Sequence, residues 1–470
     1  MAGPKPAKRV IIVGAGISGL AAAYDLAKAG VAATVFDKQP RAGGVIETRT
    51  SEGCSLECGP DSFLAVKPEA VALIKELGFG DEVIGSNDHQ RTTYILKHGR
   101  LVPLPEGVMM IVPSRVMPMV KTSLVGWGTK IRMGMEYFRK PGASVGDRSV
   151  ADFVTDHFGS ETLDYLAEPL LSGVYGGDPA QLSIASVLPR FVEMEKKYGS
   201  LVKGVLAGRN ARPKKPGEKK PGQAPAPLFQ TLKTGLGKLV DTLASHAEIA
   251  HAQVDAIERA GSEEGSGYRV RVSGEWVIAD HVILACPAWA AGQLVSGIDA
   301  KLGEQLSAID YSSSVTLSLI YKANEFDGRR AGFGFLVPKK ERQRLAACTF
   351  VGTKFSYRVP DDRIALRCFF GGIGDAGILD ESDDAIVAMA REELQRILSL
   401  RAAPISTVIS RWPRSMAQYT VGHGQRLTEI RQRVSSINGL HLAGNAYEGI
   451  GISDCIRTGR AAAKAIIAAE

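Results

Sequence analysis

The chain has 470 residues, of which 45% are apolar and 23% are charged, and its formal net charge is +7. This composition is ordinary for a globular protein, and the length predicts two or three domains with a large core. No run of 18 apolar residues occurs, which excludes a helix that spans a membrane. Much of the positive charge lies in residues 208–229, a stretch rich in Pro and Lys that cannot bury apolar surface, so we expect a flexible loop there. Nucleic acid is not expected as its partner, because no aromatic side chains for stacking accompany these cations.

The first expected elements form a dinucleotide-binding turn. An apolar strand over residues 10–13 runs into Gly14-Ala15-Gly16-Ile17-Ser18-Gly19, and a helix is expected to follow. Gly14 permits a tight turn, Gly16 lets the backbone approach a pyrophosphate, and Gly19 lets the helix pack closely on the strand. The N-terminus of that helix offers free N–H groups and a positive dipole end to the phosphates.

A second strand ends at Asp37, where a carboxylate would accept hydrogen bonds from a ribose hydroxyl and repel a 2′-phosphate. The sequence then continues as Arg41-Ala42-Gly43-Gly44. Paired glycines would let the backbone run close under a second phosphate or a flavin, with Arg41 as a charged donor. This pattern favours FAD over NAD, and a glycine-rich turn with a surface arginine is the alternative.

The next elements are a helix over about residues 69–77, a hairpin over 91–107 with its turn at His98-Gly99, and a mostly helical stretch over 108–207. Six of the ten methionines fall between positions 109 and 135, with Trp127 and several basic residues among them. Adaptable Met side chains with Trp and Lys or Arg suit a membrane interface. The helical stretch is therefore either a surface for peripheral membrane contact or an ordinary soluble core.

Residues 229–237 lead into a helix that runs through Leu243, and short strands are expected over 250–256, 268–272, 276–279 and 281–287. Val254 on the first of these would cover the adenine of a dinucleotide. Residues 306–424 alternate strands and helices, which suits a substrate domain built on an antiparallel sheet. A second G-x-G-x-x-G pattern at residues 372–377 is interpreted as a turn, because the helical pattern begins only near Asp383.

The C-terminal part returns to the nucleotide site. The sequence Gly444-Asn445-Ala446-Tyr447-Glu448-Gly449-Ile450-Gly451 precedes an Ala-rich helix, so the two ends of the chain are expected to form two halves of one flavin site. The six cysteines are scattered, which indicates a reducing cytoplasm and no metal site. The first residues lack an apolar signal segment, and we expect a cytoplasmic protein.

The chain resembles the bacterial oxygen-dependent porphyrinogen oxidases, which oxidise protoporphyrinogen IX or coproporphyrinogen III in haem synthesis. The resemblance covers nearly the full length. It depends most on two narrow motifs, Ser172-Gly173-Val174-Tyr175-Gly176-Gly177-Asp178 and Tyr447-Glu448-Gly449-Ile450-Gly451-Ile452-Ser453-Asp454-Cys455-Ile456. It is supported by Glu57-Cys58-Gly59-Pro60-Asp61-Ser62-Phe63, by Arg411-Trp412-Pro413 with Gln418-Tyr419, and by Gly422-His423.

This resemblance implies an α/β and α+β fold with three domains. A discontinuous, glutathione-reductase-like (Rossmann) FAD domain would comprise residues 1–90, 230–305 and 425–470, and an antiparallel-sheet substrate domain would comprise 91–107 and 306–424. Residues 108–207 would form a helical, membrane-associated domain. FAD would be bound non-covalently, with molecular oxygen as the electron acceptor and hydrogen peroxide as a product. A monomer or homodimer at the inner face of the cell membrane, passing its product to ferrochelatase, would fit this role.

The implied site has no acid–base triad, because a hydride leaves the macrocycle directly for the flavin. Substrate contacts are implied for Arg91, Leu170, Gly173, Phe369 and Phe370. Cofactor contacts are implied for Gly14, Ala15, Gly16, Ser18, Gly19, Asp37, Lys38, Arg41, Gly43, Gly44, Gly59, Pro60, Asp61, Ser62, Val254, Trp412, Gly444, Asn445, Gly449, Ile450, Gly451 and Ile452. Each also has a purely structural alternative, and for His423 a structural role is preferred to a catalytic one.

The substrate is left open between the two porphyrinogens, with a preference for coproporphyrinogen III. Protoporphyrinogen-specific members of the family often carry an arginine in the hairpin where this chain has Thr93, and Arg91 is the same-face neighbour if both lie on a strand. The competing functions are a flavin amine oxidase, a carotenoid desaturase and a non-catalytic protein that binds flavin and porphyrin. An amine oxidase would need aromatic residues facing each other across the flavin, and only Tyr447 is a visible candidate.

Overall fold

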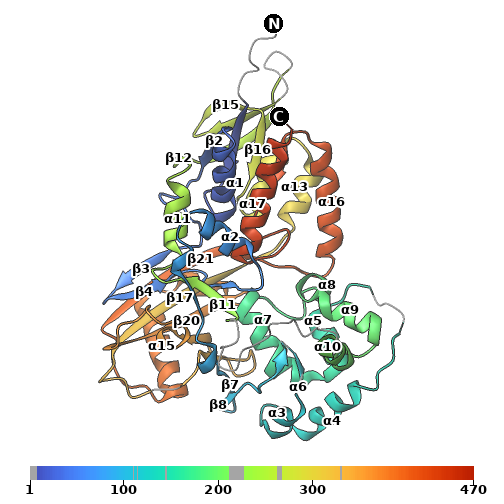
Figure 1. The fold of residues 1–470 in the computed structure, drawn as a ribbon, viewed down its shortest axis with the longest axis vertical. Coiled ribbons are helices and arrows are strands. Elements are labelled where there is room, and N and C mark those ends of the chain that lie inside the picture. The colour runs from blue at the N-terminus through green and yellow to red at the C-terminus, as the bar shows by residue number, and fades with distance from the viewer. Residues whose placement is uncertain are drawn as a thin grey trace.

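The computed structural model describes residues 8–109, 111–113, 115–142, 146–210, 227–261, 267–328 and 331–469. Residues 211–226, and with them most of the expected flexible loop, lie outside this range. In Figure 1 a parallel sheet with its helices occupies the top of the molecule, a second large sheet lies at the lower left, and a group of helices lies at the lower right.

Five parallel strands form the first sheet, in the order β12-β2-β1-β16-β22. Its central strand is apolar on both faces, as expected for a parallel sheet that is covered on both sides. The strands are β1 (Arg9–Val13), β2 (Ala32–Phe36), β12 (Glu248–Ala250), β16 (His281–Leu284) and β22 (Leu440–Leu442), and the helices α1 (Ile17–Lys28) and α17 (Ile452–Ile467) pack against each other beside it. The first and last helices of the chain are therefore neighbours, as the sequence predicts.

Smaller elements surround this sheet. Strand β11 (Phe229–Leu232) pairs with β5 (Phe63–Leu64) and β6 (Val83–Gly85), and β3 (Thr48–Ser51) pairs with β4 (Cys54–Glu57). The antiparallel sheet β13-β14-β15 has strands Val254–Arg259, Tyr268–Val272 and Glu275–Ala279. The helices of this part are α2 (Glu69–Glu76), which confirms the predicted helix, α11 (Gly237–Ala244), α12 (Ala288–Val295), α13 (Ala300–Ser307) and α16 (His423–Ser436).

The predicted strand over residues 250–256 is wrong. The chain instead turns between β12 and β13, where the N–H of Ala252 donates to the carbonyl of Ala250. These two strands belong to different sheets, so Val254 begins the antiparallel sheet and is only half-buried there. Apolar and polar residues alternate without interruption from Ala250 to Ala256, so the sequence pattern gives no sign of the turn.

The second large sheet has seven strands, in the order β21-β17-β20-β19-β18-β7-β8. All its neighbouring strands are antiparallel except β18 and β7. Its strands are β7 (Thr93–Lys97), β8 (Arg100–Pro103), β17 (Tyr311–Lys322), β18 (Gly334–Leu336), β19 (Leu345–Phe350), β20 (Arg363–Gly372) and β21 (Ser406–Ala417), with α14 (Val351–Lys354) after β19. Strands β7 and β8 form the predicted hairpin.

Helix α15 (Asp383–Leu398) packs on one face of this sheet, and its N-terminus is capped by the Ser382 hydroxyl. The second G-x-G-x-x-G pattern forms the end of β20 and a 3-10 turn, Ala376–Asp380, and no helix opens at its last glycine. This confirms its interpretation as a turn. The opposite face of the sheet is directed toward the loops of the nucleotide part, as the hydrogen bonds described below establish.

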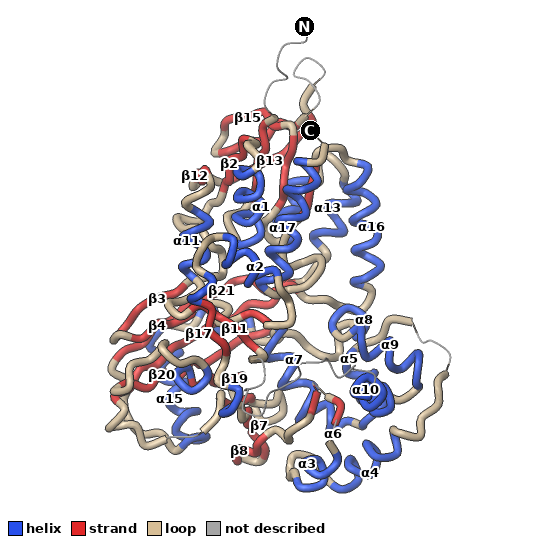
Figure 2. Tube along the Cα trace, in the orientation of Figure 1, coloured by secondary structure: helices blue, strands red, loops and turns tan. Residues whose placement is uncertain are grey.

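The third part is helical (Figure 2). After the short strands β9 (Val108–Met109) and β10 (Val112–Pro113) come α3 (Val116–Lys121), α4 (Trp127–Glu136), α5 (Val150–Phe158), α6 (Ser160–Thr162), a π-helical turn (Leu163–Ala167), α7 (Glu168–Tyr175), α8 (Ile184–Val187), α9 (Pro189–Tyr198) and α10 (Leu201–Asn210). Within the described residues, no helix is long and apolar enough to cross a lipid bilayer.

Candidate functional site

The three glycines of the first turn have the geometry that a dinucleotide requires. Gly14 has φ +109°, and a Cβ there would lie 2.8 Å from the carbonyl oxygen of Ala285. A Cβ at Gly19 would lie 1.9 Å from the carbonyl oxygen of Gly14, so only glycine permits the observed packing of α1 on β1. Above Gly16, by contrast, nothing lies within 4 Å of a Cβ position. This open space adjoins the N-terminus of α1, which has no side-chain cap and no acidic residue in its first turn.

Asp37 lies directly after β2, where it was predicted. Its carboxylate accepts hydrogen bonds from the N–H of Ala15 at 2.7 Å and from the N–H of Gln39 at 2.8 Å. Each oxygen keeps a further lone pair for a hydroxyl group, while the two amides fix the orientation of the carboxylate. The adjacent Lys38 is exposed.

The Arg41 guanidinium stabilises its own loop. It donates to the carbonyls of Ala42 at 2.9 Å, Ile46 at 3.0 Å and Gly44 at 2.6 Å. These bonds hold the loop so that Gly43 pairs with Gly16, and a Cβ at Gly44 would lie 3.4 Å from the Gly16 Cα. The predicted close approach of the two glycine turns is therefore present, and Arg41 contributes to it by bracing the loop.

The C-terminal motif lies beside the first turn. Gly444 has φ +133° with nothing within 4 Å of a Cβ position, so the backbone is open to a ligand there as it is at Gly16. Gly449 has φ +125°, and Gly451 is the N-cap of α17, which also has no side-chain cap. The two open glycines thus lie near the N-terminus of α1, whereas the first turn of α17 carries the Asp454 carboxylate, which lies against Gly449 and Gly451. Ile450 and Ile452 flank the N-terminus of α17.

Backbone carbonyls of the loop after β4 accept hydrogen bonds from side chains of the seven-stranded sheet. The carbonyl of Cys58 accepts from the Thr316 hydroxyl at 2.6 Å and from the Trp412 indole N–H at 2.8 Å. Arg367 donates to the carbonyl of Gly59. These bonds bring Gly59, Pro60 and the following residues against the sheet face, and they give Trp412 a positioning contact in addition to its ring surface.

Asp61 is the anionic centre of this loop. It accepts from the Lys354 ammonium at 2.7 Å and from the Ser62 hydroxyl at 2.6 Å. Burial alone would raise the pKa of Asp61, but the charges of Lys354 and Arg367 outweigh it and hold that pKa well below its usual value. Burial lowers the pKa of Arg367, and Asp61 opposes that effect. The structure therefore places an ionised carboxylate and two cations behind the loop.

One row of side chains on the sheet face leads from this loop to α7. Register pairs Leu336 with Ala347, Ala347 with Phe369, and Phe369 with Thr316, so these side chains lie on one face. A Cβ at Gly173 would lie 3.3 Å from Leu336 Cδ2, which puts α7 against the same row. Exposed Gly173 is therefore placed against the row that contains Phe369, and half-buried Leu170 lies on the same helix.

Phe370 does not share this position. It points to the opposite face of β20, is 1% exposed and packs with Ile386 and Leu394 of α15. The prediction that it contacts substrate is corrected for this reason, because neighbours on a strand face opposite sides of the sheet.

The predicted placement of Arg91 is also wrong. The chain makes a 3-10 turn at Asp88–Gln90, and β7 begins only at Thr93, so Arg91 does not share a strand face with Thr93. Its guanidinium lies 3.6 Å from Asp88 and its side chain is 46% exposed. The turn-forming run Ser86-Asn87-Asp88 before the strand is the signal for this turn in the sequence.

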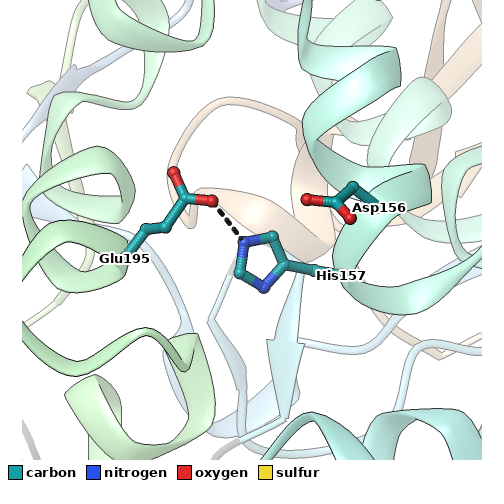
Figure 3. Close-up of side chains that lie close together, drawn as sticks. All are labelled: Asp156, His157 and Glu195. Atoms are coloured by element: carbon teal, nitrogen blue, oxygen red, sulfur yellow. Dashed lines mark hydrogen bonds and ion pairs between the residues drawn. The ribbon is translucent and has the colours of Figure 1, made fainter. Parts of the chain in front are cut away.

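A separate cluster of Asp156, His157 and Glu195 joins α5 to α9 (Figure 3). The His157 ring is buried between Glu136 at 2.8 Å and Glu195 at 3.1 Å. Arginines already neutralise its carboxylates, because Arg139 and Arg148 pair with Asp156 at 2.6 Å and 3.1 Å and Arg148 pairs with Glu195 at 2.5 Å. The cluster is therefore a charge network that holds the helices together, since both ring nitrogens are already engaged.

Sequence reasoning missed several residues of the site. Thr316, Lys354 and Arg367 come from strands and a short helix far from any motif, and only pairing across the sheet brings them to the loop. Arg367 carried a readable signal, a single cation within the apolar run Ile364-Ala365-Leu366-Arg367-Cys368-Phe369-Phe370. A charge buried at such a position needs a partner, which indicates a function or a fixed contact.

The sequence model of one protein family, the flavin containing amine oxidoreductases, matches residues 17–467 of this chain. The chain belongs to this family. The coproporphyrinogen III oxidase of Bacillus subtilis (strain 168) is 33% identical over 97% of both chains. Protoporphyrinogen oxidase 1, chloroplastic, of Arabidopsis thaliana is 27% identical over 95% of this chain and 85% of its own.

Solved structures agree with the family. A protein from Exiguobacterium sp. 255-15, provisionally named a protoporphyrinogen oxidase, has a TM-score of 0.86 at 29% identity, covering 99% of this chain and 100% of its own. A redesigned putrescine oxidase has a TM-score of 0.70 at 18% identity, covering 98% and 99%, which shows the shared fold alone. The predicted relationship to the porphyrinogen oxidases and the predicted flavin fold are confirmed.

The residues present fit FAD. The open spaces above Gly16 and Gly444 admit a backbone-hugging pyrophosphate, and the uncapped N-terminus of α1 supplies N–H donors for it. Asp37 retains acceptor capacity for ribose hydroxyls. The carbonyl-braced loop 58–62 and the 444–451 loop provide two backbone walls, between which an isoalloxazine ring would be held.

Proposed function

We propose that this protein oxidises coproporphyrinogen III to coproporphyrin III by removing six electrons in three steps, with oxygen as the final acceptor and hydrogen peroxide as product. The observation that carries the proposal is the similarity to the Bacillus subtilis coproporphyrinogen III oxidase, which extends over 97% of both chains. Protoporphyrinogen IX is the second candidate substrate. Bound FAD would accept a hydride from a bridging carbon of the macrocycle.

The site is suited to a large apolar ring. Phe369 and Leu336 would form one apolar wall and Leu170 another, with exposed Gly173 and Val174 between them and solvent. The Gly173 carbonyl would accept pyrrole N–H groups and so hold the macrocycle. No general base is required of these residues, because the pyrrole protons can leave to water.

The alternatives are less well supported by the residues. An amine oxidase would need an aromatic cage, but Tyr447 is only 7% exposed and belongs to the same buried cluster as Tyr311 and Tyr419. It therefore belongs to the core and does not face an open site. A non-catalytic flavin and porphyrin carrier would not reduce its flavin with a porphyrinogen, and the experiment below distinguishes it.

The test is an anaerobic mixture of the purified holoprotein with coproporphyrinogen III and, separately, with protoporphyrinogen IX. Bleaching of the oxidised flavin absorbance, followed by porphyrin fluorescence on admission of air, is expected. The faster substrate identifies the activity. Bound flavin that neither porphyrinogen bleaches would overturn the proposal.

We also propose that the tip of the helical part contacts an anionic membrane surface peripherally, at the inner face of the cell membrane. Trp127, Ile131, Met135 and Phe138 follow one face of α4 and its end, and with Val116 and Met117 of α3 they are 61–76% exposed. Lys130 lies 4.7 Å above the Trp127 ring. A solvent-exposed apolar face bordered by cations suits an interface with lipid headgroups. In Figure 1 these helices lie at the end of the molecule opposite the termini.

A further inference from the structure

Gln418 and Tyr419, the two residues that directly follow β21, contact both halves of the site. Gln418 is 2% exposed, and its amide donates to the carbonyl of Tyr175 at 2.8 Å. That carbonyl belongs to the last residue of α7, two positions after Gly173. Gln418 thus holds the end of the helix that carries the expected substrate contacts.

Tyr419 points to the other half. Its hydroxyl donates to the carbonyl of Asn445 at 2.8 Å and accepts from the N–H of Gly449 at 2.9 Å. The hydroxyl therefore both donates and accepts a hydrogen bond within the loop that lies along the expected flavin edge, and it closes that loop. The ring is 4% exposed and is stacked on His423, so it cannot tilt away.

The backbone around these residues is itself fixed. Ser183 N–H donates to the Tyr419 carbonyl at 2.8 Å, and Val421 N–H donates to the Gln181 carbonyl at 2.9 Å. The packing around Gln418 is equally tight, because a Cβ at Gly177 would lie 2.2 Å from Gln418 Oε1. Backbone hydrogen bonds therefore join the segment after α7 to the segment that follows β21.

We infer that Gln418 and Tyr419 are positioning residues that set the distance between the substrate helix α7 and the flavin-edge loop 445–449. Hydride transfer needs reacting atoms about 3–3.5 Å apart, and a displacement of about 1 Å can cost about 100-fold in rate. Gln418, which contacts α7, and Tyr419, which contacts the 445–449 loop, are joined by a single peptide bond. A shift of either contact is therefore passed directly to the other. The role inferred for Gln418 rests on the proposed function, because α7 carries the expected substrate contacts. The role inferred for Tyr419 rests on the loop contacts alone.

The experiment compares Tyr419→Phe, Gln418→Met and a matched control, Tyr268→Phe. Tyr268 is also fully buried, and its hydroxyl donates to the carbonyl of Asn438 at 2.6 Å, away from the site. For each variant, the dissociation constant of FAD is measured by titrating the apoprotein. The rate constant of flavin reduction by saturating coproporphyrinogen III is then measured anaerobically on the holoprotein, together with the melting temperature.

Tyr419→Phe is expected to weaken FAD binding about tenfold and to slow flavin reduction by about tenfold, because two loop contacts are lost. Gln418→Met is expected to leave FAD affinity within about twofold and to slow reduction about tenfold at saturating substrate. Tyr268→Phe is expected to lower the melting temperature only.

The inference is overturned if Tyr419→Phe matches Tyr268→Phe in FAD affinity and reduction rate, or if Gln418→Met reduces its flavin at the wild-type rate. If the wild-type flavin is not reduced at all, the proposed function fails, and the FAD titration still decides the role of Tyr419.

Discussion

The imidazole of His423 lies flat on the phenol ring of Tyr419, with ring centroids 4.1 Å apart and planes inclined by 12°. Within the described part of the chain, neither ring nitrogen of His423 makes a hydrogen bond of standard geometry, although the backbone of Ala446 lies close to the ring. Burial, followed by the nearby charge of Arg426, lowers the pKa of His423 to about 4. The ring is therefore neutral at pH 7 and supports Tyr419 by stacking, which favours the structural role over a catalytic one.

This pKa makes stability depend on pH in a defined direction. In the unfolded chain His423 is protonated below about pH 6.5, whereas in the folded chain it is protonated only below about pH 4. The free energy of unfolding should therefore fall between about pH 6.5 and pH 4, with His423 accounting for roughly 2–3 kcal/mol of the loss. Burial, with a smaller effect from His281, lowers the pKa of His441 to about 4 as well, so it adds a loss of the same sign.

We expect His423→Phe, which keeps a stacked ring, to flatten this dependence. Urea unfolding at pH 7.5 and pH 5 measures it, with His246→Gln at an exposed position as the control. An undiminished pH dependence in His423→Phe would show that the buried ring is not responsible.

The second prediction concerns Gly16, whose backbone has φ −70° and ψ 174° and whose Cβ position is open. Any L-residue fits this conformation, so Gly16→Val should fold with an unchanged melting temperature of the apoprotein. The added side chain would occupy the expected pyrophosphate space, and FAD binding should weaken at least about tenfold. Flavin content after purification and FAD titration of the apoprotein measure this.

The chain offers a matched control for that change. Gly374 lies in the second G-x-G-x-x-G pattern, also with nothing within 4 Å of a Cβ position. Gly374→Val should retain the wild-type flavin content. Equal flavin content in the two variants would mean that the first turn does not hold the pyrophosphate.

This pair of glycine patterns shows how far the sequence determines the site. The first is followed at once by helix α1 and the second is not, and periodicity alone distinguished them. Local rules likewise placed Asp37 after β2 and the turn at His98-Gly99. Phe370 and Arg91 were misplaced because each needed one fact that periodicity does not supply, namely which face of β20 is covered by α15 and where β7 begins. Residues such as Lys354 reach the site only through long-range pairing, for which a single sequence carries no signal.

The third prediction concerns a buried ion pair behind the loop. Arg358 and Glu57 have side chains 2% exposed, with Nη1 and Oε1 2.8 Å apart, and Arg358 also donates to Thr231 and to the carbonyl of Leu232. Burial raises the pKa of Glu57, and Arg358 opposes this effect. Removing one partner leaves a buried charge without compensation, so Arg358→Met should cost about 3–5 kcal/mol in the free energy of unfolding.

The double variant Arg358→Met with Glu57→Gln tests the reason for that cost. Because the stranded charge is gone, we expect it to be more stable than Arg358→Met alone. Urea unfolding at pH 7 measures both. A double variant that is less stable than the single one would assign the cost to lost packing and backbone hydrogen bonds, and not to the buried carboxylate.

The fourth prediction tests the proposed membrane contact. Trp127 and Ile131 lie one helical turn apart on α4 and are 66% and 61% exposed. Replacing both with serine should weaken sedimentation with vesicles that contain anionic phosphatidylglycerol by about tenfold or more, since burial of each side chain in the interface contributes about 1.5–3 kcal/mol at most. Flavin content and the rate of flavin reduction by dissolved coproporphyrinogen III should not change, because α4 lies far from the nucleotide turn (Figure 1).

Tyr357→Ser, at a residue 70% exposed elsewhere on the surface, is the control and should sediment like the wild type. High salt should weaken wild-type binding further if Lys130 and its basic neighbours contribute. Equal sedimentation of the double-serine variant and the wild type would contradict a lipid contact at α4 and would leave its apolar face to a protein partner.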